Sequence, residues 1–182
     1  MIALSTEKWV SYGLTVLAKQ GHGALKADTL ARSLKVTRGS FYWHFKDVAD
    51  FHRAVIALWR RQATEDVIAR INALDDKSAR LPTLFRTALA SSITALEKAM
   101  RAWALTDPGA RQAVAEVENI RVRYLEQLLI AAKVPAKSIS SRAHIIHWTF
   151  VGFSNIYGDI PEDRTAILDE LISFAISNTD AL

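Results

Sequence analysis

The chain has 182 residues, 50% of them hydrophobic and 23% charged, which excludes wholesale disorder and leaves ample material for a core. It contains no cysteine, which excludes disulfides, thiolate metal sites and a cysteine nucleophile. Of the net charge of +4, residues 1–61 contribute ten Lys and Arg against four Asp and Glu, and residues 62–182 contribute thirteen against fifteen. This imbalance indicates a polyanionic partner for the first third, or else chance clustering of solvated charges.

No basic segment followed by an apolar run opens the sequence, and no apolar stretch approaches the roughly 18 residues that span a bilayer. We therefore expect a cytoplasmic protein without a membrane partner.

The first predicted helix is STEKWVSYGLTVLAKQG, in which apolar or small residues recur at helical spacing. Ser5 or Thr6 can cap its start, and Gly21 and Gly23 end it.

Three further helices are predicted before residue 62. A short one covers about 27–34, and a second short one covers about 38–44 after Thr37 as N-cap. Asp47 caps a fourth helix that continues into the 60s.

The pattern stays helical beyond that point. Pro82 suits the first turn of a helix to about 102, and another helix begins at Pro108 and runs to about 133. A long apolar helix is predicted over 138–157, then a turn at 158–161, then a last helix to about 177. No alternating β-branched run predicts a strand. The expected fold is all-α, with about nine helices: a three-helix head in residues 1–50 and a larger helical domain in residues 51–182.

The stretch KVTRGSFYWHFKD raises the question why four aromatics stand among basic residues. Two short helices joined by a tight break form a helix-turn-helix arrangement, which presents its second helix to the DNA major groove. Phe41 and Phe45 are four apart and share a face, so they are expected in the core. The outer faces then carry Arg38, Ser40, Tyr42, Trp43 and His44.

These outer side chains suit nucleic acid. Arg38 can bind guanine through two hydrogen bonds or bind a phosphate, and Ser40 can bond a base edge. The other polar groups suit phosphate oxygens. They are the helix N-terminus at Thr37, the side chains of Tyr42 and His44, and the flanking Lys26 and Lys46. A small helical core with incidental polar surface residues would show the same pattern.

Residues 9–52 resemble the DNA-binding head of the TetR/AcrR family of transcriptional regulators. The similarity lies in WVSYGLTVLAKQG, in the pair Leu30-Ala31, and in VTRGSFYWHF, with its Tyr-x-His-Phe ending. The resemblance implies that Tyr42 and His44 contact the DNA backbone and that Thr37 caps the recognition helix. It also implies groove-lining roles for Arg38, Gly39, Ser40 and Trp43.

Three positions depart from the family pattern. Lys35 stands where a turn glycine is usual, so the turn is expected to require a strained backbone. Val48 replaces a phosphate-binding lysine, for which Lys46 is the candidate substitute. Leu25 and Lys26 occupy the place of a Ser or Thr cap.

The C-terminal helices indicate self-association. AHIIHWTFVGFSNIYG is apolar on more than one face, and ILDELISFAIS adds a second apolar stripe. Two such helices suggest a four-helix bundle with a second copy, as in the dimers of the resembled family; a fully intramolecular core is the alternative. The predicted interface comprises Ile146, Phe150, Phe153, Ile167, Leu171 and Phe174.

The same region is expected to hold a small-molecule effector between its helices. Each candidate pocket wall also suits an ordinary core position. The candidates are Phe85, Leu89, Trp103, Tyr124, Leu128, His147, Trp148 and Phe150, the last of which is also in the predicted interface.

Catalysis is not indicated. His144 and His147 are three apart, but no carboxylate at matching spacing completes a metal site, and no nucleophile-elbow or phosphate-loop motif is present. We expect no metal and no cofactor. The sequence predicts a homodimeric repressor released from a near-palindromic operator by a small molecule. The alternative is a helical ligand- or protein-binding module with only nonspecific nucleic-acid association.

Overall fold

A computed structural model describes residues 4–89, 91–155 and 165–177, and within these ranges every regular element is helical. Two of the ten α-helices, α4 (Val48–Arg60) and α5 (Asp66–Asn72), are joined by a π-helical stretch, Arg61–Glu65. Counted as one, they leave nine helices in the described ranges, which confirms the all-α prediction. None of these helices combines the length and the apolar character that crossing a membrane requires.

The chain forms two compact units. The N-terminal unit joins Met1–Ala63 to Ala95–Ala115, and the second unit joins Thr64–Thr94 to Glu116–Leu182. The N-terminal unit therefore contains the head together with the end of α7 (Ser91–Ala104) and the start of α8 (Pro108–Ala131).

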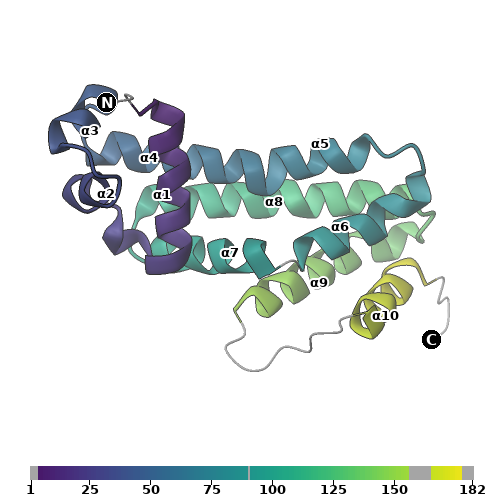
Figure 1. The fold of residues 1–182 in the computed structure, drawn as a ribbon. Helices are drawn as coiled ribbons and strands as arrows, with labels where there is room; N and C mark the ends of the chain where they lie inside the picture. The colour runs from purple at the N-terminus through teal and green to yellow at the C-terminus, as the bar shows by residue number, and fades with distance from the viewer. Residues whose placement is uncertain (1–3, 90, 156–164, 178–182) are drawn as a thin grey trace. The chain divides into compact units, whose positions relative to one another are not determined.

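In the N-terminal unit, α1 (Thr6–Gln20) packs against α4 and crosses it (Figure 1). Ser5 caps α1 by accepting from the backbone N–H of Lys8, and Gly21 ends it at a φ of 77°, a conformation that glycine adopts without steric cost. The first helix is therefore confirmed from cap to cap.

Next to α1 and α4 lie α2 (Ala27–Ser33) and α3 (Arg38–His44), which pack against each other. The turn between them places Lys35 at a φ of 56°. Its N–H donates to the Arg32 carbonyl, and the Val36 N–H donates to the Ala31 carbonyl, which is the Schellman pattern that glycine normally completes. The expected strain at Lys35 is thus present in the backbone.

The second unit is built from α5, α6 (Arg80–Ala88), most of α8, α9 (Ala136–Ser154) and α10 (Thr165–Ile176), with α6 packed against α5 and α10. Its core is one apolar cluster. The larger side chains in it are Phe85, Tyr124, Leu125, Leu128, Leu129 and Ile146.

Two predicted helices differ from the observed ones. The single helix expected to 102 is two helices, α6 and α7, with Pro82 in the first turn of α6. α6 ends at Ala88, and α7 begins with Ser91 and Ser92, which are weak helix formers. No proline or glycine marks the break between the two helices. The helix expected over 138–157 is α9, which ends at Ser154; the predicted turn at 158–161 lies outside the described residues.

Candidate nucleic-acid interface

The inner side of α3 is anchored by two phenyl rings. Phe41 is fully buried and Phe45 is 3% exposed. The Phe41 ring meets Trp9 of α1 edge-on at 5.5 Å between centroids and meets Phe51 of α4 at 5.3 Å. Since α1 and α4 hold these rings, α3 has a fixed rotation about its axis, and the predicted inner pair is confirmed.

The outer side of α3 faces solvent. Trp43 is 87% exposed and Tyr42 is 42% exposed, both high values for aromatic residues. Arg38 and Gly39 are exposed, and Ser40 and His44 are half-buried. These six residues of α3, which are predicted to meet DNA, are therefore at least partly accessible.

The start of α3 is capped as predicted. The Thr37 hydroxyl oxygen accepts a hydrogen bond from the Ser40 N–H at 3.3 Å. A Cβ placed on Gly39 would lie no closer than 3.7 Å to any neighbour, the Thr37 hydroxyl oxygen. The fold itself therefore does not require glycine at position 39.

Arg38 is held by two partners. Its Nη2 donates to the Tyr42 hydroxyl at 3.2 Å, and its Nε lies 3.4 Å from Oδ1 of Asp28 on α2. The guanidinium carbon also lies 5.4 Å from the centre of the Tyr42 ring. The hydrogen bond to Tyr42 and the charge of Asp28 raise the pKa of Arg38 further above its usual range, so it is a cation at every physiological pH. The sequence analysis did not select Asp28.

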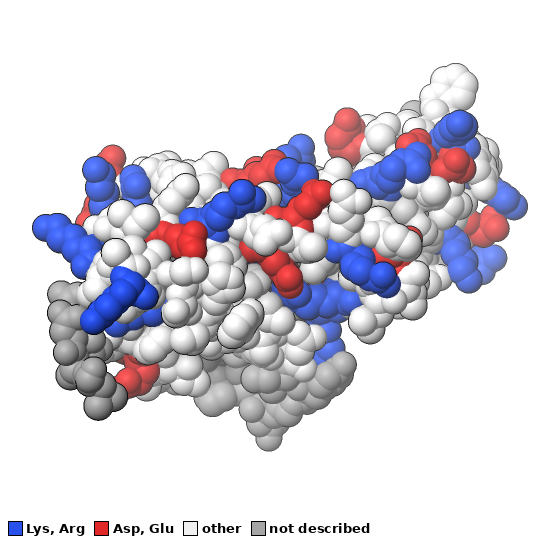
Figure 2. All heavy atoms as spheres, turned by 180° about the vertical axis from the view of Figure 1, so that it is seen from behind, with Lys and Arg blue, Asp and Glu red and all other residues white. Residues whose placement is uncertain are grey.

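The flanking lysines are both exposed. Lys26 occupies the N-cap position of α2 without a side-chain cap bond, in keeping with the missing Ser or Thr. The Lys46 N–H donates to Asp50 at 3.2 Å, which fixes its backbone beside α3. Val48, in the place of the family lysine, is half-buried. Figure 2 shows Lys and Arg side chains, with a few acidic ones, at the end where α2 and α3 lie.

The predicted effector residues fall into both units. Phe85, Tyr124 and Leu128 lie together in the core of the second unit. The Tyr124 hydroxyl donates to Asn72 Oδ1 at 2.8 Å, and burial raises the pKa of Tyr124. Trp103 instead belongs to the N-terminal unit, where His22 stacks on it at 5.8 Å and His52 meets it edge-on at 5.1 Å. Leu89 and His147 are buried in the second unit.

For two residues of α9, the observed burial differs from what the predicted role requires. Ile146, predicted for the dimer interface, is 4% exposed and lies in the core of its own unit. Trp148, predicted as a pocket wall, is 64% exposed. The side of α9 that faces away from the core carries Ile145 and Trp148, a rotation that an all-round apolar sequence does not reveal.

The other predicted interface residues remain at least partly accessible. Phe150, Phe153 and Leu171 are half-buried, and Ile167 and Phe174 are exposed.

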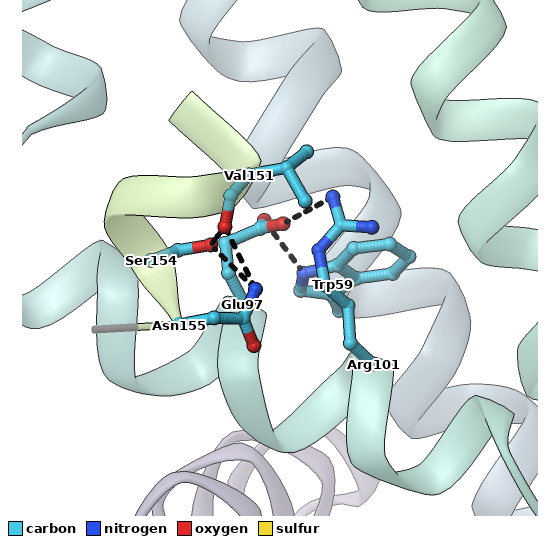
Figure 3. A network of polar contacts seen from close by, with 6 residues as sticks. All are labelled: Trp59, Glu97, Arg101, Val151, Ser154 and Asn155. Carbon is cyan, nitrogen blue, oxygen red and sulfur yellow. Dashed lines mark hydrogen bonds and ion pairs between the residues drawn. The ribbon is translucent and has the colours of Figure 1, made fainter. Parts of the chain in front are cut away.

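A buried carboxylate escaped the sequence analysis. Glu97 of α7 is 1% exposed, accepts from the Trp59 Nε1 at 3.3 Å and lies 3.9 Å from Arg101 (Figure 3). Glu97 lies three residues before the apolar Met100, and this spacing places both on the same, buried face of the helix. In the second unit, Figure 3 also shows the Ser154 hydroxyl donating to the Val151 carbonyl at 2.8 Å.

Within the described ranges, no three His, Cys, Asp or Glu side chains lie close enough to hold a metal ion. His144 and His147 gain no third ligand there. The His144 Nδ1 lies 2.8 Å from the Ser140 carbonyl of its own helix.

In the described residues, α2 and α3 form a helix-turn-helix whose second helix is capped and presents a polar surface beside a basic flank, which is the arrangement that DNA-binding heads use. Residues 11–55 match the family model described as "Bacterial regulatory proteins, tetR family". Residues 11–55 are therefore a DNA-binding head of the type found in that family.

No match is found among curated protein sequences. Among solved structures, a putative fatty acid metabolism regulator of Clostridium perfringens is similar, with a TM-score of 0.70 and 18% sequence identity. The similarity covers 96% of this chain and 99% of that one. At this identity it shows that the fold extends through both units.

Proposed function

We propose that the protein is a homodimeric repressor that binds a near-palindromic operator and is released by a small molecule. Residues 1–50 supply DNA binding, and residues 51–182 supply effector binding and dimerisation. The protein acts as a regulator without catalysing a reaction.

The observation that carries this proposal is the division of α3 into two sides. Phe41 and Phe45 fix the helix from behind, and Arg38, Ser40 and Trp43 are left for base edges. The Thr37 helix start, Gly39, Tyr42, His44, Lys26 and Lys46 then serve close approach and the phosphates.

Dimerisation is supported by apolar side chains left in solvent on the last two helices. Ile145 and Trp148 of α9, and Ile167, Phe174 and Ile176 of α10, are exposed within the second unit. A two-fold pair of such surfaces would bury them and set two recognition helices at a fixed separation, which requires an operator with two half-sites.

The effector site is proposed in the apolar core of the second unit, at Phe85, Tyr124 and Leu128. The Tyr124 hydroxyl, bonded to Asn72, is a polar group within this apolar surrounding that can orient a ligand. An effector that binds one separation of the two heads more tightly than another would shift the population and change operator affinity.

The test is selection of bound fragments from random duplexes, followed by binding assays with variants. An enriched inverted repeat supports the regulator, whereas recovery without sequence preference supports the nonspecific module. Arg38→Ala is expected to lose base preference worth about 1–3 kcal/mol, and Tyr42→Phe to bind all sequences more weakly. Lys19→Ala is the charge control, because Lys19 lies at the opposite end of α1 from Thr6, about 20 Å along the helix.

A further inference from the structure

We propose that Asp28 is a positioning residue for sequence recognition, which orients the Arg38 guanidinium so that its terminal edge reads a guanine. The inference rests on the proposed role of Arg38 in base reading and adds to it a residue that makes no contact with DNA itself.

The two side chains come from the two helices of the helix-turn-helix. Asp28 lies in the first turn of α2, and Arg38 is the first residue of α3. The Asp28 carboxylate lies 3.4 Å from Nε of Arg38, and Tyr42, one turn further along α3, accepts from Nη2 at 3.2 Å. The hydrogen bond to Tyr42 and the ion pair with Asp28 thus involve different nitrogens of the guanidinium.

The remaining donors define what Arg38 can do. A guanidinium has five N–H groups. One hydrogen of Nη2 is donated to Tyr42 and Asp28 lies within ion-pair distance of Nε, whereas Nη1 and the second hydrogen of Nη2 meet no acceptor among the described residues. Those two nitrogens form the terminal fork, whose spacing matches O6 and N7 of guanine in the major groove.

The negative charge of Asp28 affects both the affinity for DNA and the preference for one sequence. Asp28 is exposed beside a surface that would meet phosphates, so its negative charge opposes every DNA sequence alike. By holding Nε, it also keeps Arg38 from turning to a nearby phosphate, a contact that carries no sequence information. The carboxylate therefore lowers affinity for all duplexes and raises preference for the one with guanine in place.

Asp50 provides the matched comparison. It is an acidic residue of the same unit, but its carboxylate pairs with Arg53 of its own helix at 3.1 Å and accepts the Lys46 N–H. Its removal changes the same charge without touching Arg38.

The experiment compares wild type, Asp28→Asn, Asp28→Ser and Asp50→Asn by fluorescence anisotropy. The probes are the operator obtained by selection and a duplex in which the guanine facing Arg38 is replaced by adenine. The two Asp28 variants are expected to bind the adenine duplex more tightly than wild type does, and to lose about fivefold to tenfold of the preference for guanine. Asp50→Asn is expected to change both affinities by one common factor.

The same substitutions in an Arg38→Ala background isolate the coupling. There, Asp28→Asn should shift both affinities equally. An unchanged guanine preference in the single variants, or an equal loss of preference in the Arg38→Ala background, would overturn the inference. If selection enriches no sequence, the proposed function and the inference fail together.

A measurement without DNA distinguishes failure of the inference about Asp28 from failure of the proposed function. In the free protein, the Arg38 Nε–H should exchange with solvent more slowly in wild type than in Asp28→Asn, as followed by NMR of arginine side chains. Equal exchange rates would show that the ion pair does not order the side chain, whatever the DNA result.

Discussion

The Oγ1 of Thr6 and the Nδ1 of His44 lie 3.0 Å apart, so the first residue of α1 is bonded to the last residue of α3. When the hydroxyl donates to Nδ1, the ring proton of neutral His44 is on Nε2. That proton is then available to a phosphate oxygen, so that α1 would help to position a residue of the proposed DNA-binding surface.

Thr6→Val is therefore expected to weaken binding to all duplexes by about fivefold, since a neutral hydrogen bond contributes roughly 1 kcal/mol. Titration of operator and non-operator duplexes measures it. Thr15→Val is the control, because the Thr15 hydroxyl donates only to the Ser11 carbonyl in its own helix. Equal affinities for Thr6→Val and wild type would show that His44 is placed without Thr6.

Gly13 marks the closest approach of α1 to α4. A Cβ at this position would lie 2.7 Å from Cζ of Phe51 and 2.9 Å from Cγ2 of Val55, both rigidly packed. Gly13→Ala is expected to lower the free energy of unfolding by about 1–3 kcal/mol, as overpacked cores do. Urea denaturation followed by circular dichroism measures the change.

Gly152→Ala is the matched control for that substitution. Gly152 is also helical, in α9, but nothing lies within 4 Å of the position of an added Cβ. Alanine should there stabilise the helix by up to about 1 kcal/mol. Destabilisation by both substitutions would indicate a general intolerance of alanine rather than the contact with Phe51.

Lys35 carries a strain that glycine would remove. Its φ of 56° is costly for a residue with a Cβ, so Lys35→Gly is expected to raise the free energy of unfolding by about 1 kcal/mol. Thermal and urea unfolding provide the measurement. Lys133, at a φ of 61° after α8, offers an independent repeat, and Ser33→Gly inside α2 should have the opposite sign.

Arg142, a residue of α9, caps the C-terminal end of α10. Its Nη1 donates to the carbonyls of Ala175 at 3.1 Å and Ser177 at 2.6 Å, and its side chain is buried. Arg142→Met should leave these carbonyls without their charged partner, at a cost of roughly 1–3 kcal/mol. We expect faster hydrogen exchange throughout α10.

Arg123→Met serves as the comparison for Arg142. Arg123 is exposed on α8 and donates to the Asn119 carbonyl within that helix. The Arg123→Met substitution should leave hydrogen exchange in α10 unchanged. If α10 were protected from hydrogen exchange equally in Arg142→Met and in wild type, a capping role for Arg142 would be contradicted.

The proposed dimer surface is tested at Trp148. Trp148→Glu places a charge at the centre of the exposed apolar side chains of α9 and should convert a dimer into monomers in sedimentation velocity. Ile130→Glu is the control, because Ile130 is 60% exposed on α8 of the same unit and has no place in the proposed surface. A monomeric wild type, or a dimeric Trp148→Glu, would remove the proposed interface.

The head was predictable because its signals are local. Thr37 caps α3 through its own side chain, and Phe41 and Phe45 share a face by spacing alone. The strain at Lys35 followed from one non-glycine residue in a turn. Helix boundaries in the first 60 residues agree with those of the structure for the same reason.

The remaining features depend on tertiary contacts. The rotation of α9, which buries Ile146 and exposes Trp148, is set by the packing of its neighbours. The pairing of Asp28 with Arg38 joins residues on two helices, and the break between α6 and α7 has no strong breaker residue. Periodicity cannot select among several apolar faces or reveal ion pairs between helices.

The five tryptophans are unevenly placed. Trp9, Trp59 and Trp103 are almost fully buried, whereas Trp43 and Trp148 are in water, one on the proposed DNA surface and one on the proposed dimer surface. Emission from an indole depends on its contact with solvent, so each surface carries its own built-in optical reporter. Replacing either exposed tryptophan with phenylalanine would leave the other as the one solvent-exposed indole among the described residues, seen against the emission of the three buried indoles, and operator binding and self-association could be timed separately in an unlabelled protein.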